Sequence, residues 1–392
     1  MNNNSMNQKY EITIFTEGDA NDATVWSNVP YYLTKTLEQK GYTIHRINVN
    51  GNPFSRFIYN KLICRFLRHT FMPHTTFSYQ RSLCFRKTVE HIIKKAVRQF
   101  PDTDLFLSTS FSYAPIKYTN KPCALFCDWT YQYYFEHFLN RKPDWLEKLE
   151  VTRQNHLLES VQQVFVLFPD VAERMTQTYT NPNIHYLGNV INSDTISDIS
   201  PVPSSEKLKK QSILFIGLPK YMEGVQSLIR AIMKLHALPQ YENIHLDIIG
   251  MNHSDFTTSS LPEEALSYIT CHGYLSKSNA NDKAKYYTLM NNAAVYVNTT
   301  PRWAGFSSAL ETLYHYVPVI TTPYESFVST FSQNIDFGSY CNSNEPDTIS
   351  SQIQDILSSD SSTYNSLCEN AHKAAMPFTW SKYVDNMLQF FS

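Results

Sequence analysis

The sequence lacks the long apolar segments that a membrane protein needs. No stretch of its 392 residues approaches the roughly 20 uninterrupted apolar residues of a membrane-spanning helix. The first ten residues, MNNNSMNQKY, are polar and contain no apolar core of a signal peptide. We therefore expect a cytoplasmic protein, and we interpret the glycosylation-like sequences at Asn252 and Asn298 as chance matches.

An excess of one charge and a cysteine framework are also missing. The 33 basic residues nearly balance the 35 acidic ones, so nothing in the composition indicates a nucleic-acid partner. The seven cysteines are scattered and odd in number, which favours a reducing compartment over a set of disulfides. Cys123 and Cys127 are close together, but they lack the second pair or the histidines of a zinc site. We interpret them as buried strand thiols and expect no metal site.

Apolar segments typical of strands alternate with helical segments from end to end. This alternation predicts an α/β fold with parallel sheets that are covered by helices on both faces. The chain is long for one domain, so we expect two doubly wound, Rossmann-like domains facing a cleft. The expected strands are 11–15, 43–47, 105–108, 123–126, 163–167, 184–187, 213–217, 245–249, 269–273, 294–298 and 319–320, with helices over 31–38 and 145–160.

The domain boundaries follow from a change in composition. Residues 192–211 are polar and contain Pro201, Pro203 and several serines, which is typical of a linker. We therefore predict an amino-terminal domain over 1–195, a linker over 196–211 and a second domain over 212–375. Residues 376–392 are predicted to form a helix that packs back on the amino-terminal domain.

Two segments of the second domain indicate a bound nucleotide. The strand that ends at Gly217 is followed by a turn with Lys220 and then a helix with Gly224, an arrangement that holds phosphate in α/β proteins. About ninety residues later, a strand, a loop and a helix with Glu311 follow one another, and one carboxylate can accept two ribose hydroxyls. The alternatives are an ordinary strand-to-helix turn and an acidic residue favoured in any first helical turn.

The first of these segments resembles the GT-B glycosyltransferases, and it is most similar to the retaining group known as family 4. In that family, Gly-Arg and a later Lys-Gly supply two cations for the donor pyrophosphate. Gly217 and Gly224 occupy the matching glycine positions, but Leu218 and Glu223 replace the two cations. The resemblance therefore leaves Lys220 as the cation that we expect to contact the phosphates and to stabilise the leaving diphosphate, with Arg230 as the alternative.

The second segment resembles the other signature of this family. There a glutamate precedes Gly-Phe, and a second glutamate lies seven residues before Pro-Val-Ile. Glu311 lies seven residues before Pro318, so the resemblance implies that Glu311 binds the ribose. Gly305 and Phe306 match Gly-Phe one residue closer to this glutamate, and Trp303 or Ala304 replaces the first glutamate, which contacts the donor sugar. The backbone donors that we expect to bind the diphosphate are those of Phe306, Ser307 and Ser308.

The amino-terminal half resembles a subgroup in which the first strand leads into an acidic loop and then Trp-Ser-Gly-x-Pro-Tyr. Here the loop 17–22 precedes Trp26, Ser27 and Asn28. Asn28 replaces the glycine, which is tolerable because asparagine accepts positive φ. We expect the amides of these three residues to face the cleft and to contribute to donor binding.

Asp128 occupies the place of a catalytic histidine in many relatives, at the end of the strand 123–126. A carboxylate there can accept the proton of an acceptor hydroxyl or orient that hydroxyl. The alternative is that Asp128 caps the following helix. Asp102 and Asp104 resemble the metal-binding pair of GT-A enzymes, but they precede their strand, so we interpret them as part of a solvated turn.

Residues 56–98 contain ten lysines and arginines and one acidic residue, Glu90. One helical face carries Lys61, Arg65 and Arg68, and the neighbouring apolar stripe is Ile58, Leu62 and Phe66. Basic amphipathic helices of this kind lie on anionic membranes. The alternative is a solvated face above a buried stripe.

Together these features predict a GT-B glycosyltransferase that moves a sugar from a UDP-type or GDP-type nucleotide sugar to a glycan, glycoprotein or lipid-linked acceptor. The resemblance implies retention at the anomeric carbon, and we expect no metal or other cofactor. The amino-terminal domain would bind the acceptor and the second domain the donor. The missing cations and the missing glutamate leave two alternatives, a degenerate scaffold that partners an active transferase and a UDP-sugar epimerase.

Overall fold

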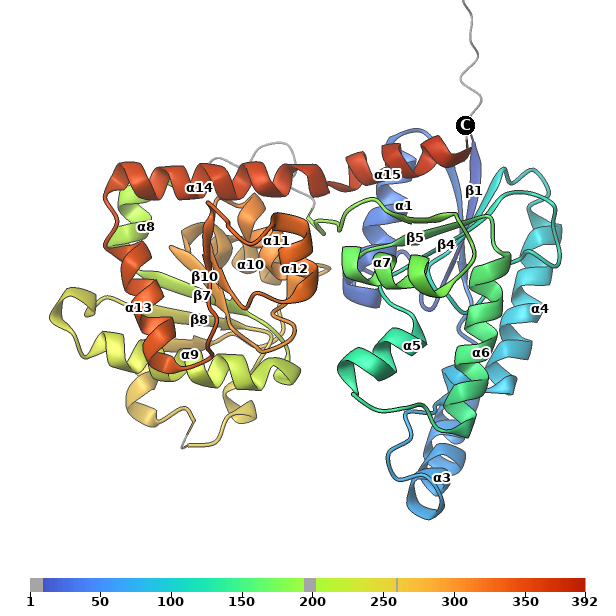
Figure 1. Cartoon of the computed structure of the whole chain (residues 1–392), viewed down its shortest axis with the longest axis horizontal. Helices are drawn as coiled ribbons and strands as arrows, with labels where there is room; N and C mark the ends of the chain where they lie inside the picture. The colour runs from blue at the N-terminus through green and yellow to red at the C-terminus, as the bar shows by residue number, and fades with distance from the viewer. Residues whose placement is uncertain (1–9, 194–201, 259, 392) are drawn as a thin grey trace, which may run out of the picture. The chain divides into compact units, whose positions relative to one another are not determined.

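The computed structural model describes residues 10–193, 202–258 and 260–391, and the chain folds into two compact units (Figure 1). The first unit comprises Met1–Gly188 and Trp380–Ser392, and the second comprises Asn189–Thr379. Each unit contains a six-stranded parallel sheet with flanking helices. The predicted fold class, two doubly wound α/β units, is confirmed.

In the first unit, the sheet has the order β2-β1-β3-β4-β5-β6. Its strands are β1 (Glu11–Thr16), β2 (Thr43–Asn48), β3 (Leu105–Ser108), β4 (Cys123–Cys127), β5 (Gln163–Val166) and β6 (Ile184–Tyr186). Its helices are α1 (Val29–Gln39), α2 (Pro53–Ile58), α3 (Arg65–Thr70), α4 (Leu83–Gln99), α5 (Tyr131–Tyr133), α6 (Trp145–Ser160), α7 (Pro169–Thr178) and α15 (Trp380–Leu388). The four inner strands, β1, β3, β4 and β5, are largely buried, as parallel strands between helix layers must be, whereas the edge strand β2 has no buried residue.

Local signals set the ends of several elements in this unit. Gly41 adopts φ +90° and donates its N–H to the Glu38 carbonyl at 2.8 Å, which ends α1. Asp144 and Glu147 form a reciprocal capping box at the start of α6. The Asp104 carboxylate accepts the N–H of Glu11 at 3.0 Å at the amino end of the sheet, so it lies away from the strand ends where α/β proteins bind ligands.

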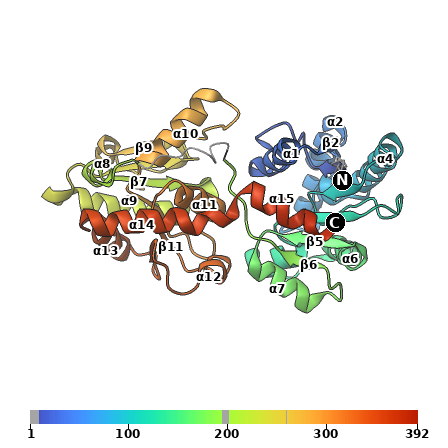
Figure 2. The same ribbon diagram turned by 90° about the horizontal axis from the view of Figure 1, so that it is seen from above.

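In the second unit, the sheet has the order β12-β11-β10-β7-β8-β9. Its strands are β7 (Ser212–Ile216), β8 (His245–Ile249), β9 (Ile269–Cys271), β10 (Val295–Asn298), β11 (Val319–Thr321) and β12 (Gly338–Tyr340). Its helices are α8 (Ser204–Lys210), α9 (Met222–His236), α10 (Ala280–Asn292), α11 (Phe306–Tyr314), α12 (Glu325–Phe331), α13 (Pro346–Leu357) and α14 (Ser361–Ala375). Figure 2 shows α14 lying along α11.

The segment predicted as a linker, 196–211, is corrected by the structure. Residues 204–210 form α8, and its Lys207 is buried with its ammonium donating to the Tyr316 carbonyl at 2.9 Å. This helix belongs to the second unit because it also packs against α14. The remaining predicted linker residues, 196–201, lie outside the described residues.

Candidate functional site

The order of strands places a topological switch point in the second unit between β7 and β10. β7 lies between β8 and β10 in the sheet. The chain runs from β7 to β8 and β9 on one side, and then crosses back to form β10 on the other side of β7. Open α/β sheets bind ligands outside the carboxyl ends of the strands at such a point. Gly217 follows β7 directly, and the loop 299–305 follows β10, so both predicted donor segments lie at this edge.

Two close backbone approaches build this edge of the sheet. A Cβ atom on Gly250, which has φ +100°, would lie 2.5 Å from the carbonyl oxygen of Gly217. A Cβ atom on Gly224 would lie 2.2 Å from Oγ1 of Thr300. Only glycine therefore allows the first turn of α9 to touch the loop after β10. The two predicted glycines, Gly217 and Gly224, hold the start of α9 against the switch point.

Lys220 lies in a short 3₁₀ turn, Pro219–Tyr221, that opens into α9. Its side chain is exposed, and its ammonium nitrogen lies 5.0 Å from the ring centroid of Tyr221. Leu218, at the place of the family arginine, is also exposed. The structure thus puts a cation at the helix start, while phosphate binding by Lys220 stays a prediction.

Arg302 is a second cation at this edge that the sequence comparison did not single out. It lies in the loop after β10, has φ +66° and is exposed. Among the described residues, none forms an ion pair with its guanidinium. Because Thr300 in the same loop contacts Gly224, this loop adjoins the turn that carries Lys220. Arg302 belongs to none of the motifs on which the resemblance rests.

The start of α11 presents backbone donors. Gly305 precedes the helix with φ +71°, and the first-turn amides of Phe306, Ser307 and Ser308 have no acceptor within the helix. The Phe306 side chain is buried, and the Ser308 hydroxyl already bonds the Gly305 carbonyl at 2.8 Å. These residues can therefore bind a diphosphate through their backbone N–H groups, and the helix dipole favours the negative charge there.

Glu311 lies in a buried polar network. Its Oε1 accepts from the Lys277 ammonium at 2.5 Å and from the Tyr287 hydroxyl at 3.3 Å. Its Oε2 accepts from the Tyr286 hydroxyl at 2.9 Å. Lys277 also donates to the Asn192 carbonyl at 2.7 Å. Burial, together with the charge of Glu311, raises the pKa of Tyr286, so this hydroxyl remains a donor.

This network differs from the open carboxylate that the sequence led us to expect. Both oxygens of Glu311 are occupied, so ribose hydroxyls would have to replace or join the present donors. Lys277 follows β9, and Tyr286 and Tyr287 lie on α10. They were missed because they lie 24 to 34 residues from Glu311 and belong to no motif quoted for the family.

The first unit contains a cavity of about 280 Å³ at its own switch point, between β1 and β3. Glu17 follows β1, Thr109 and Ser110 follow β3, and Cys127 ends β4, so the carboxyl ends of three neighbouring strands line it. Trp26 forms part of the wall, together with Val25 and Pro30. We call this cavity the β1–β3 pocket.

The loop 26–28 has an unusual backbone. Trp26, Ser27 and Asn28 have φ values of +39°, +53° and +70°, and the expectation that Asn28 accepts positive φ is confirmed. The Trp26 ring packs edge-on against Phe126 of β4, with centroids 5.7 Å apart. Three successive left-handed residues store strain of the kind found at binding sites. Of the three, Trp26 lines the β1–β3 pocket, and donor binding by this loop stays a prediction.

Asp128 and Glu17 are both near the β1–β3 pocket, but only Glu17 lines it. The Asp128 carboxylate accepts the Trp129 N–H at 2.9 Å and the Cys127 thiol at 3.2 Å, and burial raises its pKa. Asp128 does not cap α5, which is capped by Thr130. Glu17 is accessible at the pocket mouth. Desolvation by the surrounding protein raises the pKa of its carboxyl to about 6, and the positive charge of Arg56 opposes this shift. Sequence reasoning placed Glu17 only in an acidic loop.

In the described part of the chain, no group of three or more His, Cys, Asp or Glu side chains is arranged to hold a metal ion. None of its helices is both long enough and apolar enough to span a bilayer.

Comparison with known proteins agrees with this geometry. Residues 197–374 match the family described as glycosyl transferases group 1. This segment is thus similar to the group 1 glycosyltransferases. It contains the turn after β7, the loop after β10 and Glu311, so the family match covers the whole switch point of the second unit. No curated protein sequence matches the chain.

Solved structures show the same fold over nearly the whole chain. Sucrose-phosphate synthase from Thermosynechococcus elongatus is 14% identical, with a TM-score of 0.67 over 97% of this chain and 98% of that one. A glycosyltransferase from Rickettsia africae is also 14% identical, with a TM-score of 0.65 over 98% of both chains. Anabaena HepE, solved in complex with UDP and glucose, is 11% identical, with a TM-score of 0.62 over 97% and 98%. The recognition of a GT-B glycosyltransferase fold is confirmed.

Proposed function

We propose that this glycosyltransferase moves a sugar from a nucleotide diphosphate sugar, of UDP type, to a glycan, glycoprotein or lipid-linked acceptor. The observation that carries the proposal is the family match over the segment that contains Gly217, Lys220 and Glu311 at one strand edge. The structure of HepE with UDP and glucose supports the choice of UDP.

In this proposal the donor binds at the switch point between β7 and β10. Glu311 accepts the ribose hydroxyls, and the first-turn amides of α11 bind the diphosphate. Lys220 and Arg302 stabilise the charge of the leaving diphosphate, which makes a metal ion unnecessary. Lys277 holds the Glu311 carboxylate in place before the nucleotide arrives.

The acceptor binds in the β1–β3 pocket of the first unit. We propose transfer with retention, in which the acceptor oxygen bonds to the anomeric carbon on the face from which the diphosphate oxygen leaves. The acceptor hydroxyl's proton passes to the leaving diphosphate. Glu17, with its pKa of about 6, orients that hydroxyl because a carboxylate accepts its hydrogen bond, and Asp128 supports this wall of the pocket through Cys127.

Nucleotide binding tests the donor half of the proposal. UDP should raise the melting temperature of the wild-type chain more than GDP, ADP or CDP does. Glu311→Ala should abolish this stabilisation, whereas Glu263→Ala, at an exposed position of the same unit, should retain it. Equal stabilisation of the two variants would refute the role of Glu311.

Turnover separates an enzyme from a degenerate scaffold and from an epimerase. Incubation with UDP-glucose and UDP-N-acetylglucosamine, without and with acceptor glycans, should release UDP. A chain that binds UDP but never releases it from any donor would favour the scaffold. A chain that converts one UDP-sugar into its epimer would favour the epimerase.

The segment 53–71 supports a peripheral contact with an anionic membrane. Its π-helical middle, Tyr59–Cys64, and its flanking helices leave Leu62 and Phe66 65% and 59% exposed, so the expected apolar stripe is not buried. Arg56, Lys61, Arg65 and Arg68 lie in the same segment, and such cations complement anionic lipid. Sedimentation with phosphatidylglycerol vesicles should exceed that with phosphatidylcholine and should fall in Leu62→Glu, while Leu266→Glu, an exposed leucine of the second unit, should behave as wild type. Equal sedimentation with both lipids would refute the contact.

A further inference from the structure

The connection between β3 and β4 leaves an opening on the first unit. These strands are parallel neighbours, and a parallel pair needs a crossover that is usually a helix. Here residues 109–122 contain no helix and run as a loop between α4 and α6. Because a loop fills less space than a helix, a pocket of about 220 Å³ remains there. We call it the α4–α6 pocket.

The floor of this pocket is apolar. Phe85, Val89 and Ile93 recur every four residues on α4 and are buried, so they present one face of that helix. Leu157 of α6 and Ile116 of the loop complete the apolar lining. A floor of this kind favours the apolar part of a ligand.

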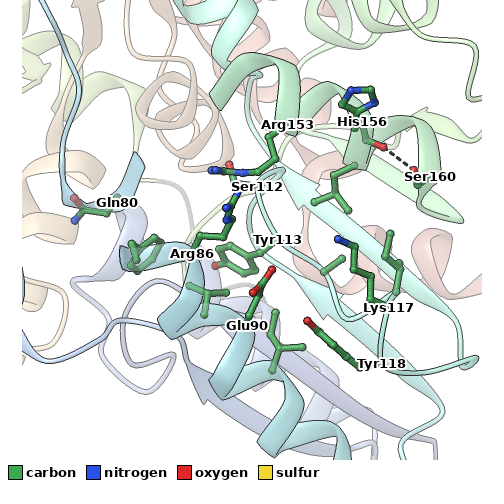
Figure 3. Close-up of a pocket in the computed structure, with 16 residues that line it drawn as sticks. Gln80, Arg86, Glu90, Ser112, Tyr113, Lys117, Tyr118, Arg153, His156 and Ser160 are labelled. Carbon is green, nitrogen blue, oxygen red and sulfur yellow. Dashed lines mark hydrogen bonds between the residues drawn. The ribbon is translucent and has the colours of Figure 1, made fainter. Parts of the chain in front are cut away.

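The charged groups of the pocket are mostly basic, since three cations and one carboxylate line it. Figure 3 shows the side chains of Arg86 and Arg153 pointing toward each other beside Ser112, with Lys117 farther along. Arg153 pairs with Glu150, but no described residue forms an ion pair with Arg86. Glu90, one turn after Arg86, is the acidic residue of the lining and forms no ion pair with it.

Convergence of two guanidinium groups is unfavourable unless an anion lies between them. Burial lowers the pKa of Arg153, and the positive charge of Arg86 lowers it further, whereas the charge of Glu90 opposes this shift. A guanidinium offers a planar set of donors that matches phosphate oxygens, so two of them suit one doubly charged phosphate. Tyr113, a buried residue, also lines the pocket.

We propose that the α4–α6 pocket binds a phosphate monoester with a small apolar body. The phosphate lies between Arg86 and Arg153, and the apolar body lies on Val89 and Ile93. The family match lies entirely in the second unit, and none of the residues assigned to sugar transfer lines the α4–α6 pocket. The site is therefore separate from the proposed transferase function and does not depend on it.

Calorimetric titration of the full chain with hexyl phosphate tests this site. Arg86→Gln should weaken binding by at least about tenfold, because a charge-assisted hydrogen bond is lost. Ala114→Phe, which fills the pocket from the loop, should weaken it similarly. Lys87→Gln removes the same charge from the next residue of α4, which is exposed and does not line the pocket, so binding should stay within about twofold of wild type.

The same titrations contain the results that would overturn the proposal. Unchanged binding in both Arg86→Gln and Ala114→Phe would place the ligand elsewhere. Weakened binding in Lys220→Gln would assign it to the donor site. If hexanol bound as tightly as hexyl phosphate, the phosphate group would not contribute to binding. If inorganic phosphate bound as tightly, the apolar lining would not contribute to it.

Discussion

Replacing Lys277 by methionine should destabilise the second unit strongly. The Lys277 ammonium and the Glu311 carboxylate are 2.5 Å apart, and their side chains are only 8% and 5% exposed. At this distance the attraction is about 7 kcal/mol for an effective dielectric constant of about 20. Desolvation of both ions offsets much of it, but removing one partner leaves a buried charge and costs about 3–5 kcal/mol. The Tyr286 and Tyr287 hydroxyls still solvate the carboxylate, so we expect about 3 kcal/mol.

A double-mutant cycle isolates the pair from the rest of the network. Glu311→Gln keeps the hydrogen-bonding shape and removes the negative charge, and the double variant Lys277→Met/Glu311→Gln has neither ion. We expect the double variant to lose about 2 kcal/mol less free energy of unfolding than the two single variants lose together. The reason is that Lys277→Met no longer leaves a charge unpaired when Glu311 is already glutamine.

Urea denaturation of the full chain measures these free energies of unfolding. Lys285→Met on α10, at an exposed position, is the matched control and should change stability by less than about 0.5 kcal/mol. If Lys277→Met cost no more than this control, the ion pair would contribute nothing to the fold and the reasoning would be wrong.

Three further predictions follow from other groups. Gly224→Ala should cost about 2–3 kcal/mol in urea denaturation, because its Cβ would meet Thr300; a neutral or stabilising change would contradict the close approach. With its carboxyl pKa of about 6, Glu17 should make kcat/KM rise as pH increases through 6, and Glu17→Gln should abolish that rise; an unaltered profile would exclude Glu17 from acceptor activation. Burial would raise the pKa of Glu147, but its hydrogen bonds, first that from Arg141, lower it to about 2, so stability is fully present above pH 4.5 and is lost as pH falls toward 2. This loss, on the order of 3 kcal/mol, should be absent in Glu147→Gln, and equal acid sensitivity of the two proteins would contradict it.

Most strands could be predicted because burial on both faces demands continuous apolar runs. The segment 213–217 has such a run and became β7, and the glycines that open α9 followed from the same pattern. β12 could not be found in this way, because Gly338–Tyr340 is short, half-buried and contains no apolar run. The helix α8 was missed because its sequence is polar, and Lys207 is buried through a tertiary contact, its hydrogen bond to the Tyr316 carbonyl.

Site residues that belong to a local motif could be predicted from the sequence. Their partners from distant parts of the chain could not, because only the folded structure brings them together. The place of Glu311 on α11 followed from its distance to Pro318, but its partners Lys277, Tyr286 and Tyr287 come from another element. In the first unit, the emphasis on Asp128 came from alignment with a histidine. The walls of the β1–β3 pocket depend instead on where neighbouring strands end, and these ends bring Glu17 to its mouth.

The first unit is discontinuous in sequence, and this affects how the protein is made. Phe126 of β4 packs against Trp380 and Tyr383 of α15, with ring centroids 6.1 and 5.5 Å apart. On the ribosome, this part of the hydrophobic core must wait for more than half of the polypeptide before its covering helix emerges. Any expression fragment that stops at residue 379 would leave those aromatic contacts unmade, and such a truncation would be prone to aggregate during synthesis.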